Sequence, residues 1–318
     1  MGIIKDFFRE DVFTLAYRQR DKDDPEDNLL DNPKSKFSTL EISSRYWYAD
    51  PIIIKKNDGI YVFFEMFDRH KERGVIGFSQ VLEGGALTEP QAVLNTGYHL
   101  SYPFIFEKEG KTYMIPETQA KRRLELYVSR DFPYGWERIG VIKNHVKLHD
   151  STMTANDEGM YLFTGEAAEG PFQTKLLVYN VEFNDGKIEL YEHPSSPLSE
   201  DSSCSRPAGR IFYHNRILVR PSQDCSKNNY GRALVFNRIL RLDRKECREI
   251  FYRRIEPKDL KINFNRDIRG VHTYGQCEGM EIIDIKYSVF SIKYAVKRFR
   301  YVAESLIRRR PIAYFQRE

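Results

Sequence analysis

The sequence predicts an all-β fold, a five-bladed β-propeller followed by a short C-terminal basic helix. A pair of short strands joined by a tight turn recurs along the chain, with repeats that begin at residues 50, 102, 150, 206 and 272. The repeats are therefore 52, 48, 56 and 66 residues apart. A period of roughly 50 residues built on short strands is typical of propeller blades. Five repeats predict five blades.

The first repeat shows the unit most clearly. Residues 52–54 and 60–64 are short runs of β-branched and aromatic side chains, which indicate strands. Between them, residues 57–59 read Asn-Asp-Gly and supply the positive backbone angles that a tight turn requires. A hairpin places the start of its first strand beside the end of its second strand. We therefore expect Asp50 and Glu65 to meet at the open end of this hairpin.

The later repeats follow the same plan, and their turns fall at residues 107–110, 156–159 and 214–215. The fifth repeat is fainter, with its turn near residues 277–279. The same argument predicts that polar residues from every blade converge on one rim of the central channel. The expected groups are Tyr102 with Glu117, Asp150 with Glu166, Arg206 with Arg220 or Gln223, and His272 from the fifth blade.

The two ends of the chain flank the propeller, which we expect to span residues 45–290. Residues 1–44 form an N-terminal extension in which 13–18 is a plausible strand that closes the ring against the last blade. Residues 291–318 form the basic helix, because apolar residues at 299, 302 and 306 fit one helical face. Such a helix either packs against the last blade with a solvated basic end or lies on an acidic membrane surface or a partner.

Composition excludes several classes of protein. The 318 residues are 41% hydrophobic with a net charge of +4, which argues against a disordered chain and does not indicate nucleic-acid binding. Charged residues interrupt the first eleven positions, and no apolar run approaches the ~20 residues of a membrane span. We therefore expect a cytoplasmic protein, either free or peripheral at the inner membrane surface. The four cysteines lack CxxC spacing, so we expect neither a zinc site nor disulfides. We name no metal ligands and no cofactor, and the sequence leaves open whether a metal lies in the channel.

Three carboxylates are the candidate catalytic residues: Asp50, Glu117 and Asp150. Carboxylates that cluster raise one another's pKa, so one can remain a protonated acid while another acts as a base. Making or breaking a glycosidic bond requires such a pair. In the alternative interpretation, carboxylates at strand starts cap turns and satisfy backbone groups.

The fourth blade adds basic residues, because Arg206, Arg210 and Arg220 lie near the expected rim. Guanidinium groups bind phosphate or carboxylate oxygens in a bidentate manner, which favours an anionic sugar or a sugar nucleotide as ligand. Alternatively, the arginines neutralise the carboxylates in a structural ring. His272 is a base, a phosphate contact or a satisfied core histidine. The candidate substrate-binding residues are Glu65, Tyr102, Glu166, Arg206, Arg210, Arg220, Gln223, Asp224 and His272.

Several of these motifs resemble a known family. The motifs lie at residues 46–51, 63–65, 99–104, 114–117, 206–210 and 220–225, and the likeness extends over roughly residues 13–285. They resemble the N-terminal domain family of glucosamine inositolphosphorylceramide transferase, which includes bacterial chains. That family is similar to the five-bladed propellers of glycoside hydrolase family 43.

The resemblance implies a role for one carboxylate. In family 43 an aspartate on the first strand of the first blade is the general base, and this position matches Asp50. The other two acids of family 43, a pKa-tuning aspartate and an acid glutamate, have no clean match here. The plant proteins carry their recognised glycosyltransferase domain C-terminal to this region, so the resemblance does not by itself transfer their activity.

Three hypotheses follow from the sequence. The first is sugar transfer from an anionic or phosphate-activated sugar, such as a sugar nucleotide, in surface-polysaccharide or glycolipid biosynthesis. The second is a glycoside hydrolase that uses the same carboxylates on an acidic glycan. The third is a non-catalytic propeller that binds glycans.

Overall fold

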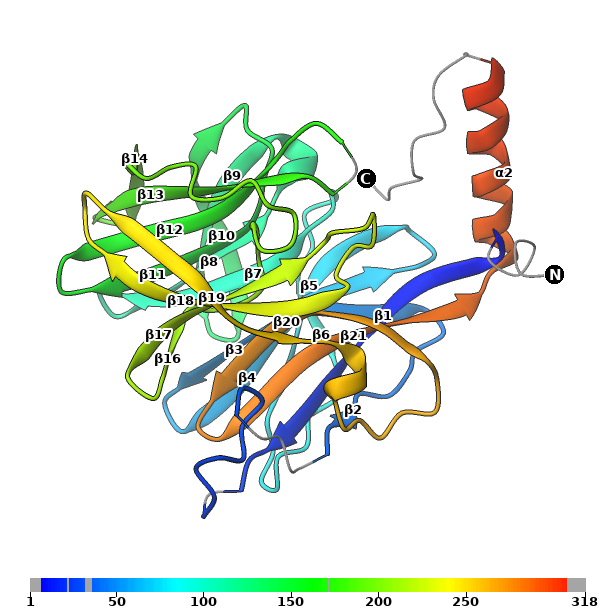
Figure 1. Cartoon of the computed structure of the whole chain (residues 1–318), viewed down its shortest axis with the longest axis horizontal. Helices are drawn as coiled ribbons and strands as arrows, with labels where there is room; N and C mark the ends of the chain where they lie inside the picture. Colours follow the sequence, from blue (N-terminus) through cyan, green and yellow to red (C-terminus); the bar gives the residue numbers. More distant parts are fainter. Residues whose placement is uncertain (1–6, 22, 32–35, 171, 308–318) are drawn as a thin grey trace.

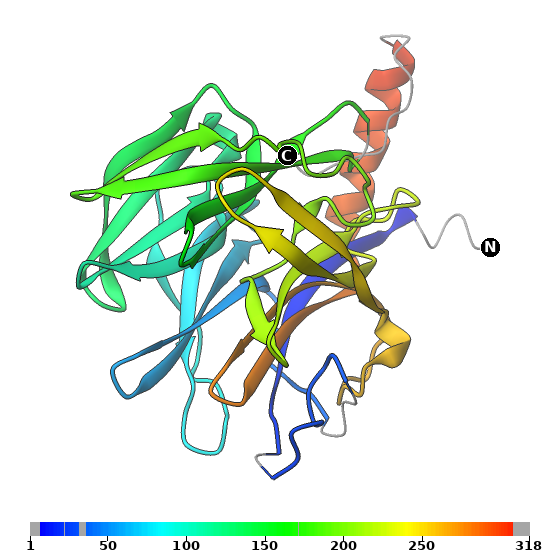
Figure 2. The same cartoon turned by 60° about the vertical axis from the view of Figure 1, so that its left-hand side comes forward.

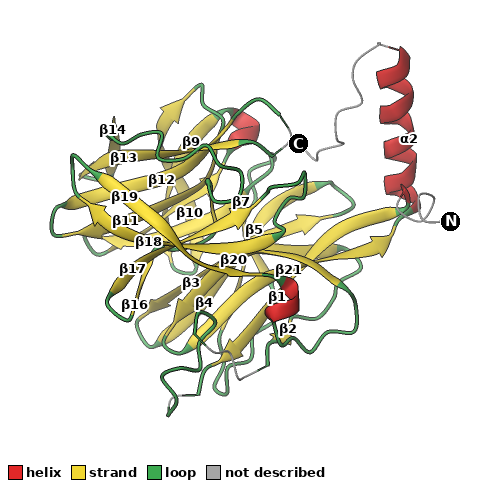
Figure 3. Ribbon diagram, viewed as in Figure 1, coloured by secondary structure: helices red, strands yellow, loops and turns green. Residues whose placement is uncertain are grey.

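The computed structural model describes residues 7–21, 23–31, 36–170 and 172–307. Five antiparallel sheets stand around a common centre, and helix α2 projects from one corner (Figures 1 and 2). Strands make up nearly all of the regular structure (Figure 3). The predicted fold, five blades and one short C-terminal helix, is confirmed.

The first three blades are formed by consecutive strands. The first blade is β3 (Tyr46–Lys56), β4 (Gly59–Asp68), β5 (Arg73–Gln80) and β6 (Gln91–Leu94). The second is β7 (Ser101–Lys108), β8 (Lys111–Glu117), β9 (Arg123–Asp131) and β10 (Tyr134–Asn144). The third is β11 (Leu148–Asn156), β12 (Gly159–Ala167), β13 (Thr174–Asn184) and β14 (Lys187–Glu192).

In the fourth blade the innermost strand is split into two short pieces. Its strands are β15 (Arg206–Pro207), β16 (Phe212–His214), β17 (Ile217–Asp224), β18 (Ala233–Leu242) and β19 (Cys247–Ile255). Both β15 and β16 pair with β17. Two 3-10 helices, η1 (Gln119–Lys121) and η2 (Pro257–Asp259), lie in connections between strands.

The fifth blade joins the two ends of the chain. Its strands are β20 (Ile268–Cys277), β21 (Met280–Phe290), β1 (Arg9–Gln19) and β2 (Ser38–Thr39). β1 pairs with β21 along its whole length (blue beside orange in Figure 1). The expected strand at 13–18 therefore lies inside a longer one that closes the ring and belongs to the last blade.

The apolar core fills the space between neighbouring sheets. One cluster joins Ile52 of the first blade, Phe104 and Ile115 of the second and Leu162 of the third, all of them buried. Burial of each such side chain contributes about 1.5–3 kcal/mol. This packing holds the blades at fixed positions around the centre, where the candidate site lies.

A bulge interrupts the first strand of four blades at equivalent places. The register shifts lie between Ala49 and Ile52, Ser101 and Phe104, His149 and Thr152, and Val271 and Tyr274. Within the first three bulges, Asp50, Tyr102 and Asp150 adopt left-handed φ angles of 56°, 41° and 53°. Such angles are costly for residues other than glycine, and bulges re-aim side chains near functional sites.

Helix α2 (Ile292–Ile307) follows β21 directly. Ser291 caps its start, because the Ser291 hydroxyl accepts the backbone N–H of Tyr294 at 3.2 Å. Within the described residues, no helix has the length and apolar character that crossing a membrane requires. The last part of the expected basic helix, residues 308–318, lies outside the described residues.

Candidate active site

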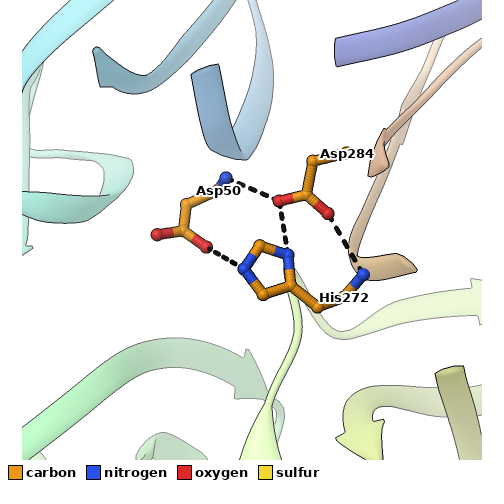
Figure 4. Close-up of side chains that lie close together, drawn as sticks. All are labelled: Asp50, His272 and Asp284. Carbon is orange, nitrogen blue, oxygen red and sulfur yellow. Dashed lines mark hydrogen bonds and ion pairs between the residues drawn. The ribbon is translucent and has the colours of Figure 1, made fainter. Parts of the chain in front are cut away.

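The first part of the site is a triad of Asp50, His272 and Asp284 from the first and fifth blades (Figure 4). Asp284 accepts the backbone N–H of Asp50 at 2.8 Å and lies 2.6 Å from Nδ1 of His272. Nε2 of His272 lies 3.7 Å from Oδ1 of Asp50, which also accepts the Thr273 hydroxyl at 3.2 Å. The two aspartates therefore lie on opposite sides of one imidazole ring.

Burial gives this triad unusual proton affinities. Burial, reinforced by the charges of Asp150 and Asp284, raises the pKa of Asp50 to about 7, although His272 opposes the shift. For His272, burial disfavours the imidazolium, but Asp284 and Asp50 outweigh it and raise the pKa of His272. Asp50 is therefore a carboxyl that exchanges a proton near neutral pH, as a general base must.

The second part of the site joins the second, third and fourth blades. Asp150 accepts hydrogen bonds from Nε of Arg206 and from the Gln223 amide, the latter at 3.0 Å. Nη2 of Arg206 also lies 3.8 Å from Oε2 of Glu117. Asp150 and Arg206 both act electrostatically on Asp50, so the two parts form one charged centre.

Glu117 has the properties of a proton donor. Burial, together with repulsion from Asp150 and Asp50, raises the pKa of Glu117 well above its usual value. A hydrogen bond between the side chains of Glu117 and Asp150 favours the protonated form of Glu117. The centre thus holds a carboxylic acid at Glu117 and a carboxyl poised near neutrality at Asp50.

Two side chains at the border of the centre are partly exposed, Arg206 at 19% and His99 at 31% of their side-chain surfaces. His99 accepts the backbone N–H of Gly74 at Nδ1, and its Nε2 lies 3.6 Å from Oε1 of Glu65. Burial lowers the pKa of His99 to about 4, so its imidazole is neutral. Glu65 and His99 therefore form the first-blade edge of the site.

Aromatic rings border the charged groups. Phe13 stacks on the His272 ring with 4.6 Å between centroids, and Tyr230 meets the same ring edge-on. The guanidinium of Arg206 lies over Tyr230 at 4.9 Å, and Phe172 stacks on the outer side of Tyr230. These contacts fix the orientation of the histidine and the arginine, and the rings are of the kind on which sugar faces pack.

Two of the three predicted arginines lie away from the carboxylates, which corrects the expected three-arginine clamp. Arg220 is buried in a bidentate pair with Glu249 at 2.8 and 2.6 Å, because β17 directs it away from the centre. Arg210 packs over Phe104 at 4.7 Å and donates to the carbonyl of Ile105. Of the three arginines, only Arg206 contacts the candidate catalytic carboxylates, Asp150 and Glu117.

The structure also relocates two predicted acids. Asp224 pairs with Arg254 and, at 3.4 Å, with Arg232, in an ion-pair network on the far side of the sheet from Gln223. Glu166 lies opposite Leu148, one residue beyond Gly165, which is the position equivalent to Glu65 and Glu117 in the first two blades. Its side chain therefore points to the other face of the strand. Neither belongs to the centre.

Tyr102 connects blades. Its hydroxyl accepts the backbone N–H of Gly209 at 2.6 Å and lies 2.7 Å from the Thr152 hydroxyl. The residue is completely buried, and burial raises the pKa of Tyr102. Tyr102 therefore holds the second, third and fourth blades together, and its hydroxyl is occupied by protein partners.

The triad also has the spacing of a possible cation site, since one ligand atom from each residue lies within 4.8 Å of the others. However, the Asp284 oxygens already receive four donors: the backbone N–H groups of Asp50, His272 and Thr273, and the imidazole. Little capacity remains on Asp284 for a metal ion. The contacts therefore favour an ion-paired triad over a metal centre.

Sequence reasoning missed Asp284, Thr273 and Tyr230. Asp284 lies on the second strand of the faint fifth repeat, opposite Leu15 of the ring-closing strand. A stronger fifth repeat would have pointed to it, since the earlier blades also place acids on their second strands. No local signal marked Tyr230, which reaches the site from a loop.

This arrangement defines a class: a five-bladed propeller with a cluster of buried carboxyls at the centre of the ring. Solved structures share the fold. A β-xylosidase covers 77% of this chain and 92% of its own, with a TM-score of 0.55 and 14% identity. A family 117 glycoside hydrolase from Zobellia galactanivorans covers 88% and 92%, with a TM-score of 0.53 and 11% identity.

The sequence comparisons identify the family. The family model described as glucosamine inositolphosphorylceramide transferase 1, N-terminal, matches residues 34–272, so the chain belongs to that family. Glucosamine inositolphosphorylceramide transferase 1 of Oryza sativa subsp. indica is 32% identical over 208 residues, 64% of this chain. The Arabidopsis thaliana protein of the same name is 32% identical over 206 residues. The chain spans only 27% and 26% of the lengths of these relatives.

Proposed function

We propose that the chain transfers a sugar between hydroxyl groups in glycolipid biosynthesis, with Asp50 as base and Glu117 as acid. The observation that carries this proposal is the opposed state of the two carboxyls, one poised near neutral pH and one held protonated. The relatives are named glucosamine inositolphosphorylceramide transferase, a name that joins a sugar with an inositol-containing lipid, which supports transfer. The acceptor is then a sugar or inositol hydroxyl.

In the proposed step, Asp50 takes the proton from the acceptor hydroxyl as its oxygen attacks the anomeric carbon of the donor. The bond from that carbon to the leaving oxygen breaks, and the leaving oxygen takes the proton of Glu117. Each carboxyl changes its proton once, so the charge of the site is conserved. Positioned acids and bases of this kind contribute about 10²–10⁴-fold each.

The presence of only one arginine beside the site carboxylates indicates which class of sugar donor fits the site. Arg206 already contacts Asp150 and Glu117. A diphosphate donor requires several cations or a metal ion, whereas one guanidinium suits a neutral sugar or a sugar with one acidic group. The site therefore fits a glycosidic donor better than the sugar nucleotide that the sequence suggested.

The test compares donors with different leaving groups. Alkyl glycosides, nitrophenyl glycosides and sugar nucleotides of glucosamine and glucuronic acid are offered with and without myo-inositol, and products are identified by mass spectrometry. Glu117→Gln should slow alkyl glycosides by about 10²-fold or more and nitrophenyl glycosides far less, because nitrophenolate leaves without a proton. Asp50→Asn should slow both, and Glu137→Gln, a change on the exposed face of β10, should slow neither.

A second candidate is hydrolysis, with water as the acceptor. The solved structures with this fold include glycosidases, and the same acid and base would serve. Free sugar released at the same rate with or without an acceptor would select hydrolysis. Turnover unchanged in both Asp50→Asn and Glu117→Gln would exclude either enzyme and leave glycan binding.

A further inference from the structure

The start of α2 carries an apolar surface that the propeller does not cover. Phe290, Ile292, Val296 and Phe299 are 72%, 64%, 46% and 67% exposed. We call these four residues the α2 face. Residues 292, 296 and 299 lie on one side of the helix because their spacing follows its turn. Phe8 extends the surface by stacking on Phe290 with 5.2 Å between ring centroids.

The helix is held to the body by its other side. Ala295 is buried, and Lys293 donates to the Arg69 carbonyl at 3.1 Å and pairs with Glu72 at 2.9 Å. Lys297 also pairs with Glu72. Figures 1 and 2 both show the helix projecting beyond the sheets.

The charges beside the α2 face are positive. The charged side chains that the structure describes on α2 are Lys293, Lys297, Arg298 and Arg300. Glu72 balances part of this charge, while Arg300 is exposed beside the apolar stripe. An amphipathic helix with an apolar stripe between cations suits an interface of acyl chains and anionic headgroups.

We propose that the α2 face is a docking surface for a membrane that contains anionic lipids. Four exposed apolar side chains enter the headgroup layer, and the neighbouring cations bind lipid phosphates. The surface is also continuous with the site. Glu72 anchors the helix two residues before Gly74, whose N–H binds His99, and His99 contacts Glu65. Docking therefore places the edge of the site beside the membrane.

The test is sedimentation of the full chain with vesicles. The vesicles contain phosphatidylcholine alone or with about a third phosphatidylglycerol, in about 0.1 M salt. We expect binding to the anionic vesicles, weakened at high salt. Phe299→Ser should lower the partition coefficient by at least about tenfold, and Arg300→Gln by about fivefold.

The matched control is Phe251→Ser on β19, a phenylalanine 65% exposed on a different surface. It should bind vesicles like the unchanged protein, and circular dichroism should show that both serine variants are folded. Equal losses for Phe251→Ser and Phe299→Ser would overturn the proposal, as would equal binding to neutral and anionic vesicles. A dimer disrupted by Phe299→Ser, with no vesicle binding, would assign the α2 face to a second copy of the chain instead.

Discussion

Replacing Asp50 by asparagine tests whether ionisation of the buried Asp50 carboxyl lowers the stability of the folded protein. Asparagine keeps the shape of the residue, can accept the Thr273 hydroxyl and tolerates a left-handed backbone angle. What it removes is the titration. The pKa of Asp50 is raised from 3.8 to about 7 by burial, so the folded state binds this proton more tightly than the unfolded state.

This difference in proton affinity determines whether stability rises or falls with pH. A carboxyl with a raised pKa in the folded state costs no stability below its unfolded pKa, and its cost grows as pH rises towards the folded pKa. Each pKa unit corresponds to about 1.4 kcal/mol. From pH 5 to pH 7 the stability of the native protein should therefore fall by about 2 to 3 kcal/mol relative to Asp50→Asn, and the gap should then stay constant.

The measurement is urea unfolding followed by the fluorescence of Trp47 and Trp136, at pH values from 5 to 8.5. Asp50→Asn should be the more stable protein above neutral pH, although it loses activity. Asp50→Ala should lie about 1 kcal/mol below Asp50→Asn at every pH, because alanine is poorly suited to the left-handed angle. A gap between native protein and Asp50→Asn that does not change with pH would refute the raised pKa and the assignment of Asp50 as base.

Three further predictions concern residues that stabilise the fold. Arg220→Met should lower the free energy of unfolding by about 3–5 kcal/mol, because it leaves the Glu249 carboxylate, only 9% exposed, without its partner, and adding Glu249→Met should restore much of the loss in the same urea assay. Gly209→Ala should prevent folding, seen as loss of soluble protein, since a methyl group would lie 2.0 Å from the Tyr274 carbonyl oxygen. Tyr102→Phe should lower the stability measured by thermal unfolding by about 1–3 kcal/mol, because it leaves the Gly209 N–H unpaired. A loss of stability no larger than that of Tyr113→Phe would contradict the role of the Tyr102 hydroxyl in joining the blades.

The blades could be predicted from the sequence because each repeat carries its own local signals. A turn motif and two β-branched runs are visible without any tertiary information, as in residues 52–64. The convergence of Asp50, Glu117 and Asp150 also followed, because the ring geometry repeats with the period of the sequence. These parts depend on local propensity and on symmetry.

The direction of individual side chains could not be predicted in the same way. In a strand, neighbouring residues point to opposite faces, so Gln223 reaches the centre while Asp224 does not. A bulge inserts one more residue and reverses that order locally, and nothing in the turn residues announces it. Arg220 was misplaced for a related reason, since its partner Glu249 lies on another strand and leaves no mark near residue 220.

The bulge residues Asp50, Tyr102 and Asp150 share a backbone conformation but differ in their side chains. The bulge recurs in the first, second and third blades, but it presents an acid at Asp50, a phenol at Tyr102 and an acid at Asp150. Because Tyr102 is used to bind its neighbours, the second blade contributes its acid from the opposite strand, at Glu117. That position places Glu117 next to Asp150 and Arg206. Both carboxyls feel the charges of Asp150 and Arg206, but only Asp50 also has His272 beside it, and this imidazole opposes the rise in the pKa of Asp50.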